Sequence, residues 1–254
     1  MTTPAAVPST SPPALVDSPA PADVTWPPSD LYSDEPPLET TLHLQQMMLL
    51  LNCIDWLWKD RNDYFAGGNL TVYYSPRRRK SEDFRGPDFF VVLDTQPHPR
   101  KSWMVWEEDG KYPNVIIELL SDSTADVDRN LKKRLYAETF RTPEYFWFDP
   151  ETQEFQGFAL IRGRYQPIEA NAAGHLWSEQ LQLYLGIHSS QLRFFDPEGG
   201  LVPTPKEAAT VAEQALSSNE QALVSAEQAL TSERSHSAKL ADKLRELGID
   251  PEAV

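Results

Sequence analysis

Hydrophobic residues are concentrated in runs in the middle of the chain, with polar intervals between them. Residues 84–94 and 115–120 are rich in β-branched and aromatic side chains and predict two strands, and 102–107 predict a shorter strand between them. Residues 126–140 predict a helix, and the run at 145–148 predicts the next strand. This alternation of strands with a helix indicates an α/β fold.

A helix and several short strands are predicted on either side of this region. Residues 38–59 contain no Gly or Pro and are apolar on nearly every side, which predicts a helix that is buried on most faces. The pair Gly67-Gly68 predicts a turn, and 70–74 alternate as a strand. Four further strands, expected to extend the sheet or to pack over it, are predicted at 155–161, 165–168, 181–185 and 192–195.

The start of the chain has a composition of its own. Residues 1–37 hold ten of the 22 prolines and five acids without a base. This composition predicts a disordered acidic arm in front of a folded domain at 38–205.

The end of the chain, residues 206–254, is rich in Ala, Glu, Gln, Leu and Ser. A seven-residue repeat at 212–232 keeps Leu216, Leu223 and Leu230 in register. Such a repeat predicts a helix that seeks a partner, as in a coiled coil. Because alanines beside the leucines make the seam thin, the tail is expected either to pack on the domain or to pair weakly as a homodimer.

The overall composition limits the class of protein. With 40% hydrophobic and 11% aromatic residues, the 254-residue chain can bury a core, so general disorder is excluded. A net charge of −15 counts against a non-specific nucleic-acid coat protein. It does not exclude a nuclease, because carboxylates that hold a metal ion are themselves acidic.

The sequence also suggests a cellular compartment. Cys53 is the single cysteine, which excludes a disulfide within the chain and a thiolate zinc site. The N-terminus lacks the basic and apolar regions of a signal peptide. The longest purely apolar run, 47–51, is far too short to span a membrane. The protein is therefore expected in the cytoplasm, away from the membrane.

Two carboxylates stand on the predicted strands, Asp88 at the head of one run and Glu118 inside another. Glu118 shares a sheet face with Ile116 and Leu120, where burial of an unpaired charge would cost several kcal/mol. Its carboxylate is therefore expected to bind a metal ion or to pair with a base on the following helix. Asp88 either binds the same ion or caps a turn. Mg²⁺ or Mn²⁺, which prefers hard oxygen ligands and activates water for phosphodiester hydrolysis, suits this pair.

The predicted helix offers a lysine as a third group. Its core stripe is predicted at Val127, Leu131 and Leu135, and Lys132 lies on the ridge beside that stripe. A lysine at the margin of a buried stripe can lay its stem on the sheet and reach Glu118. There it would orient the attacking water or stabilise the transition state. Lys133 is expected to point outward.

Other basic residues are candidates for nucleic-acid contacts. The one concentrated basic run lies in a loop between strands and consists of Arg77, Arg78, Arg79 and Lys80. This run is either a phosphate contact or a solvated hairpin tip, and the sequence leaves both interpretations open. Arg129 shares the ridge of Lys132 and has the fork geometry that suits clamping a phosphate.

Taken together, these residues resemble a known family. The shared features are Pro87-Asp88, Ile117-Glu118-Leu119-Leu120-Ser121, Ser123-Thr124, Asp128-Arg129-x-x-Lys132, Tyr136 and the run from Pro143 to Pro150. With this spacing they resemble the Uma2 family (DUF820), restriction-endonuclease-like proteins of the PD-(D/E)XK nuclease superfamily that are abundant in cyanobacteria. The resemblance covers roughly residues 38–205.

The resemblance implies a restriction-endonuclease-like mixed β-sheet flanked by helices, with Asp88 and Glu118 as metal ligands. The superfamily's usual lysine lies two residues after the second acid, and this chain has Leu120 there. The lysine of this family is expected on the helix, at Lys132. The implied function is a Mg²⁺-dependent (or Mn²⁺-dependent) endonuclease acting on nucleic acid, with DNA as the expected substrate.

A rival interpretation belongs to a different class of function. The chain would keep the nuclease fold without catalysis and serve as an interaction module that assembles through its C-terminal helix. The two interpretations differ in what they require of Asp88, Glu118 and Lys132, because only the first requires these side chains to lie together.

Overall fold

A six-stranded mixed sheet forms the centre of the computed structural model, which describes residues 30–35, 40–75, 84–121, 127–248 and 250. The strand order is β1-β4-β6-β7-β8-β9. β6 and β7 are parallel, and every other neighbouring pair is antiparallel. The six strands are β1 (Tyr64–Gly68), β4 (Phe89–Leu93), β6 (Val115–Leu119), β7 (Glu144–Phe148), β8 (Phe155–Ile161) and β9 (Arg164–Pro167). The α/β class and the mixed sheet predicted from the sequence are confirmed.

The two faces of this sheet bury two separate cores. On one face, α1 (Thr41–Leu57) and a three-stranded sheet of β10 (Leu176–Ser178), β11 (Leu183–His188) and β12 (Gln191–Phe195) pack over the strands. Alternate residues of β6 point to this face, where Ile117 is fully buried. Its neighbour Ile116 enters the second core on the opposite face. Glu118 therefore lies in an apolar layer, as the alternation along the strand predicts.

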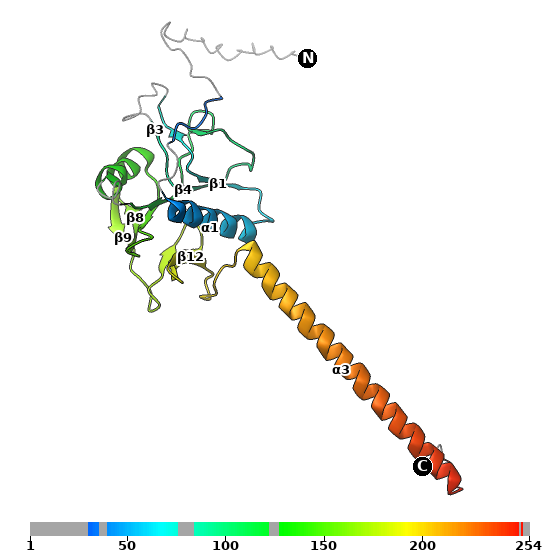
Figure 1. Cartoon of the computed structure of the whole chain (residues 1–254). Helices are drawn as coiled ribbons and strands as arrows, with labels where there is room; N and C mark the ends of the chain where they lie inside the picture. Colours follow the sequence, from blue (N-terminus) through cyan, green and yellow to red (C-terminus); the bar gives the residue numbers. More distant parts are fainter. Residues whose placement is uncertain (1–29, 36–39, 76–83, 122–126, 249, 251–254) are drawn as a thin grey trace, which may run out of the picture.

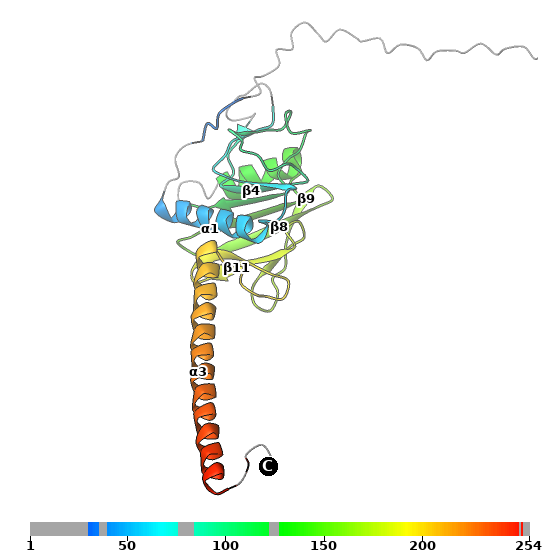
Figure 2. The ribbon, with the colours of Figure 1, turned by 90° about the vertical axis from the view of Figure 1, so that its right-hand side faces the viewer.

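The second core is covered by the helical segment between β6 and β7, here called the crossover helix (residues 127–140). It consists of η1 (Val127–Lys132), α2 (Lys133–Leu135) and η2 (Tyr136–Phe140). The two outer pieces are π-helical, so their turns are wider than those of an α-helix. Figures 1 and 2 show this helix (green) across the sheet from α1 (blue).

The π-helical geometry overturns the predicted core stripe of this helix. Leu131 is 46% exposed, and Leu135 is only partly buried. Tyr136 and Phe140 enter the core in their place. The prediction assumed 3.6 residues per turn, and the i→i+5 hydrogen bonds of π-helical turns rotate the buried face away from those positions.

The helix predicted at 38–59 is also less buried than its composition suggested. Thr40 caps α1, and its hydroxyl accepts a hydrogen bond from the His43 amide. Leu50 and Ile54 are fully buried against the sheet, whereas Leu42 and Met48 are about half exposed. The prediction of burial on most faces is wrong, because α1 forms an outer layer and only one side of it meets the sheet.

The glycine pair at 67–68 belongs to a strand and not to the predicted turn. Gly67 and Gly68 end β1, where they pair with Phe90 and Phe89 of β4. A Cβ atom on Gly67 would lie 2.8 Å from the Phe90 ring, and one on Gly68 would lie 2.7 Å from Met47 Sδ. The glycines therefore serve close packing within the sheet and beneath α1.

Short strands replace some of the longer predicted ones. Residues 84–94 divide into β3 (Phe84–Arg85) and β4, with Gly86, Pro87 and Asp88 between them. The stretch 102–107 contains only β5 (Trp103–Met104). β5 pairs with β2 (Val72–Tyr73), which also pairs with β3 in a small second-layer sheet. Leu31 and Ser33, from the end of the predicted arm, bond to Ser102 and Lys101 beside this sheet.

The last element, α3 (Pro205–Glu246), is a single helix of 42 residues that projects away from the domain (Figures 1 and 2). A capping box of Thr204 and Glu207 begins it, and none of its residues is buried. Packing of the tail on the domain, one of the two expected arrangements, is therefore contradicted. The described residues contain no helix with the length and hydropathy of a membrane span.

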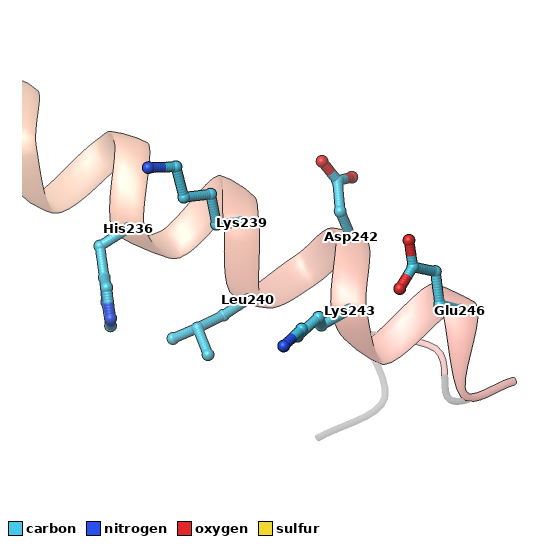
Figure 3. Close-up of a pocket in the computed structure, with 6 residues that line it drawn as sticks. All are labelled: His236, Lys239, Leu240, Asp242, Lys243 and Glu246. Atoms are coloured by element: carbon cyan, nitrogen blue, oxygen red, sulfur yellow. The ribbon is translucent and has the colours of Figure 1, made fainter.

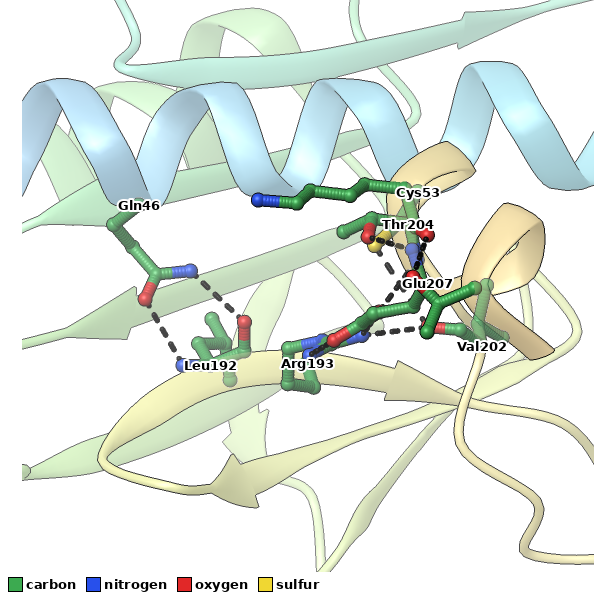
Figure 4. Close-up of polar contacts among 9 residues, drawn as sticks. Gln46, Cys53, Leu192, Arg193, Val202, Thr204 and Glu207 are labelled. Atoms are coloured by element: carbon green, nitrogen blue, oxygen red, sulfur yellow. Dashed lines mark hydrogen bonds and ion pairs between the residues drawn. The ribbon is translucent and has the colours of Figure 1, made fainter. Parts of the chain in front are cut away.

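A buried arginine fixes the base of α3 (Figure 4). Arg193 of β12 donates to both carboxylate oxygens of Glu207, at 3.0 and 2.7 Å, and to the Val202 carbonyl at 2.9 Å. Beside it, Gln46 of α1 exchanges two hydrogen bonds with the backbone of Leu192. These contacts attach both helices to the same strand, so the direction of α3 is set at its first turn.

Candidate active site

The register of β4 against β6 brings Asp88 and Glu118 together. Phe89 pairs with Ile117, so Asp88 and Glu118 are the next residues opposite each other along the two strands. The Leu119 amide donates to Asp88 Oδ2 at 2.8 Å, and the Asp88 amide lies 3.4 Å from Glu118 Oε2. Both carboxylates are thus held by strand backbone, as the predicted site requires.

The crossover helix supplies two further groups to Glu118. The Lys132 ammonium lies 3.1 Å from Glu118 Oε2, and the Tyr136 hydroxyl donates to Glu118 Oε1 at 2.7 Å. Each carboxylate oxygen of Glu118 therefore has its own partner from the helix. The Glu118 side chain is fully buried, whereas that of Lys132 remains 17% exposed. Asp88 is also partly exposed, so the site meets solvent at these two residues.

The spacing of Lys132 and Tyr136 along the crossover helix explains why both reach the site. Lys132 ends the first π-helical piece, and Tyr136 begins the second. Residues four apart lie on one side of a helix, so both side chains point to the same carboxylate. The stem of Lys132 crosses the apolar layer and its ammonium meets the strand.

The surroundings of Glu118 change its acidity. Burial raises the pKa of Glu118 from 4.5 to about 7, because desolvation disfavours the charged carboxylate. The nearby Lys132 ammonium and the Tyr136 hydrogen bond act in the opposite direction. Asp88 raises the pKa further, both through its charge and through a hydrogen bond between the carboxyl groups. The two acids are therefore close enough to resist simultaneous ionisation, which a bound cation would relieve.

His43 approaches the site from the other core and is a structural histidine. Its Nε2 lies 2.9 Å from the Leu120 carbonyl, and its Nδ1 lies 2.9 Å from Thr40 Oγ1. Both ring nitrogens are thus used, and the ring is 93% buried, with only 7% exposed. The contact ties the first turn of α1 to the end of β6, two residues beyond Glu118.

The remaining predicted site residues are not all placed. Arg77, Arg78, Arg79 and Lys80 lie outside the described residues, and so does the side chain of Arg129. Lys133 was expected to point outward, and this expectation is wrong. Its ammonium lies 3.2 Å from the centre of the Phe158 ring on β8. The wide π-helical turn carries Lys133 toward the sheet together with Lys132, and burial lowers the pKa of Lys133.

Tyr136 was not among the predicted site residues. It is fully buried, and its hydroxyl donates to Glu118 Oε1 at 2.7 Å. The available signal was its position four residues after Lys132, on the same ridge. A tyrosine hydroxyl in an apolar layer needs a partner, and the only strand acid facing that layer at this level of the sheet is Glu118.

The donor set fits one divalent ion with few protein ligands. Within the described ranges, no three His, Cys, Asp or Glu side chains are grouped so as to hold a metal. Two carboxylates from Asp88 and Glu118 are nevertheless sufficient for Mg²⁺, which usually keeps several waters and takes one or two carboxylates. Their oxygens are hard ligands, and their mutual repulsion favours a cation between them.

Comparisons with known proteins show the family to which the chain belongs. A search of curated proteins finds no match. Among solved structures, the crystal structure of a putative nuclease belonging to DUF820 from Anabaena variabilis is similar, with 16% identity and a TM-score of 0.38. The match covers 69% of this chain and 78% of that one. Residues 31–192, more than half of the chain, match the family described as Uma2, putative restriction endonuclease. The chain therefore belongs to the Uma2 family.

Proposed function

We propose that the protein is a Mg²⁺-dependent or Mn²⁺-dependent endonuclease that hydrolyses phosphodiester bonds, with DNA as its substrate. Membership of the Uma2 family supports a nuclease. The observation that carries the proposal is the convergence of Asp88, Glu118 and Lys132 at one partly exposed point. There Glu118 lies 3.1 Å from the lysine and opposite Asp88 in the sheet.

Each residue has a distinct task in the proposed reaction. Asp88 and Glu118 would hold the metal ion, which when bound polarises the phosphoryl oxygen and lowers the pKa of a bound water. The Leu119 amide orients Asp88, and the Tyr136 hydroxyl orients Glu118. Lys132 then provides a compact positive charge that stabilises the charge developing on the phosphoryl group.

The alternative for Glu118 and Lys132 is a purely structural ion pair. A structural pair of this kind is expected to be fully enclosed and to have no second acid beside it, since the second acid raises the cost of ionisation. Here Asp88 adds a like charge next to Glu118, and the lysine side chain keeps 17% exposure. An arrangement that increases electrostatic cost within a protein is typical of a functional site.

Three variants test the proposed roles with plasmid DNA and single-stranded DNA as substrates. Asp88→Asn and Glu118→Gln are expected to abolish cleavage together with Mg²⁺ binding, measured by calorimetry. Lys132→Ala is expected to abolish cleavage while Mg²⁺ and DNA still bind, because a transition-state contact is lost and ground-state contacts remain. Lys239→Ala, which changes an exposed lysine of α3, is the matched control. Cleavage by Lys132→Ala at the rate of the control would refute the role of Lys132.

A second function, assembly with another copy of the chain, is supported by α3. The heptad leucines are exposed, Leu216 by 61%, Leu223 by 66% and Leu230 by 49%. Beyond the repeat, Leu240 continues an apolar edge of the helix and points to the same side as His236 and Lys243 (Figure 3). The helix has 42 residues and is about 60 Å long, and its exposed leucines would be buried if the same leucines of a second copy packed against them.

Sedimentation of the full chain over a range of concentrations tests this assembly. Leu223→Glu is expected to shift the protein to monomer. Gln221→Glu, on the opposite side of the helix, should leave the association unchanged. A protein that is monomeric at all concentrations would refute pairing through α3. A chain that pairs and cuts no nucleic acid with any metal would instead support the non-catalytic interaction module.

A further inference from the structure

A basic groove lies between the crossover helix and the β8–β9 hairpin. Its volume is about 340 Å³. Lys133 and Arg134 line it from the helix, and Arg164 lines it from β9. Among the described residues, Glu138 is the one acid in its lining. Three basic side chains thus line the groove against a single described carboxylate.

The arginines of this groove differ from three other arginines of the domain. Arg61, Arg100 and Arg193 each form an ion pair with a carboxylate at 2.8, 2.5 and 2.7 Å. Among the residues that the structure describes, no such pair involves Arg134 or Arg164, and both are exposed. Their guanidinium groups therefore keep their donors available for an external anion.

Charge is distributed unevenly along the chain, and the groove lies where positive charge is concentrated. Residues 127–141 and 158–168 contain seven Lys and Arg against two Asp and Glu, a net charge of +5. The whole chain carries −15. A polyanion that approaches this protein is repelled by most of its surface and attracted to this face. An acidic nuclease needs one such face.

The groove adjoins the proposed catalytic residues. Lys132 and Lys133 are consecutive on the crossover helix, and Lys132 contacts Glu118 while Lys133 lies over Phe158 toward the groove. Glu118 lies on β6 and Phe158 on β8, with β7 between them, so the two sites are about 10 Å apart, two strand spacings. A nucleic-acid strand that lies in the groove can place a nearby phosphate at Asp88 and Glu118.

We propose that this groove, lined by Lys133, Arg134 and Arg164, binds the backbone phosphates of the nucleic acid that reaches the Asp88–Glu118–Lys132 site. The inference rests on the proposed function and adds the route by which the substrate is held. Guanidinium groups bind phosphate oxygens in a bidentate manner, and such contacts do not depend on the base sequence of the nucleic acid. Binding through this groove is thus independent of base sequence.

Fluorescence anisotropy with a labelled 16-base-pair duplex tests the groove, with Ca²⁺ in place of Mg²⁺ so that binding is measured without cleavage. The full chain is compared with the double variant Arg134→Ser and Arg164→Ser. The variant is expected to bind about tenfold more weakly, and its log–log salt dependence should fall by about 2, since each phosphate contact contributes about 0.9. The matched control, Arg234→Ser with Lys239→Ser, removes two exposed cations of α3 and should bind like the wild type.

A variant that binds the duplex more tightly than the wild type gives evidence that misfolding cannot explain. Glu138→Gln removes the one acid of the lining and is expected to tighten binding about two- to threefold. Equal affinities of wild type, double variant and control would overturn the groove while leaving the nuclease proposal intact. Displacement of the duplex by polyglutamate at equal charge concentration would also overturn it, because the face would then bind any polyanion. A wild type that binds through the groove without ever cutting would keep the groove and refute the nuclease.

Discussion

The Glu118→Gln variant tests directly how the raised pKa of Glu118 makes the stability of the fold depend on pH. In the metal-free protein, burial raises the pKa of Glu118 from 4.5 to about 7. Below pH 4.5 the carboxyl group is protonated in both the folded and the unfolded chain. Between these pH values the folded chain keeps its proton and the unfolded chain releases it, so stability falls as the pH rises. Above the folded pKa both states are ionised, and the contribution is lost.

The size of this effect follows from the pKa. A rise from 4.5 to about 7 corresponds to about 3 kcal/mol, since one pKa unit is about 1.4 kcal/mol. About 2 kcal/mol of it is lost between roughly pH 5.5 and 8.5. Glutamine keeps the shape of the side chain and cannot ionise. The stability of the wild type relative to Glu118→Gln is therefore expected to fall by about 2 kcal/mol across this range.

Denaturant unfolding in EDTA, followed by tryptophan fluorescence, measures this difference. Six of the seven tryptophans lie within residues 38–205, so most of the signal reports on the domain. Glu138→Gln, an exposed change on the same helix, is the control and should show no pH-dependent difference from the wild type. Added Mg²⁺ should stabilise the wild type above pH 7 and leave Glu118→Gln unaffected. A wild-type minus Glu118→Gln difference that stays constant from pH 5.5 to 8.5 would refute the argument.

Three further changes probe the packing around the site. Tyr136→Phe is expected to lower the free energy of unfolding by about 1–2 kcal/mol. It should also raise the pKa of Glu118 further, because the hydrogen bond from Tyr136 lowers that pKa in the wild type. Unfolding measured over a range of pH reports both effects. Gly67→Ala places a methyl group 2.8 Å from the Phe90 ring and should cost about 1–3 kcal/mol in thermal unfolding. Arg193→Met removes three donors from Glu207 and Val202, and should raise hydrogen exchange in the first turn of α3 while Arg234→Met does not.

The sequence predicted those parts of the fold that depend on strong local patterns. The runs at 89–93, 115–119 and 144–148 became adjacent strands, because β-branched and aromatic residues fit a sheet buried on both faces. Glu118 was recognisable because a lone acid in such a run demands a partner. The long helix α3 was likewise predicted, since its heptad repeat extends over many turns.

Other features depended on tertiary packing and local patterns did not reveal them. The pair Gly67-Gly68 has the composition of a turn, and its role in β1 is set by Phe90 and Met47, which are distant in sequence. Leu42 and Met48 are exposed because no further layer of the described chain covers the outer side of α1, and the hydropathy of the sequence does not show this. The π-helical turns of the crossover helix changed the buried face from Leu131 to Tyr136, because periodicity analysis assumes a fixed turn.

The positive charge beside Glu118 comes from the crossover helix and not from the strand. Leu120, two residues after Glu118, is 1% exposed within the second core. Lysine at that position would carry its ammonium group through the apolar layer, at a cost of desolvation. Lys132 avoids this cost, because its stem enters from the covering helix and its ammonium ends 3.1 Å from Glu118, with 17% of the side chain exposed. The crossover helix therefore delivers the positive charge while the strand keeps an apolar residue. The spacing of four residues along the crossover helix brings both Lys132 and Tyr136 to the two oxygens of one carboxylate.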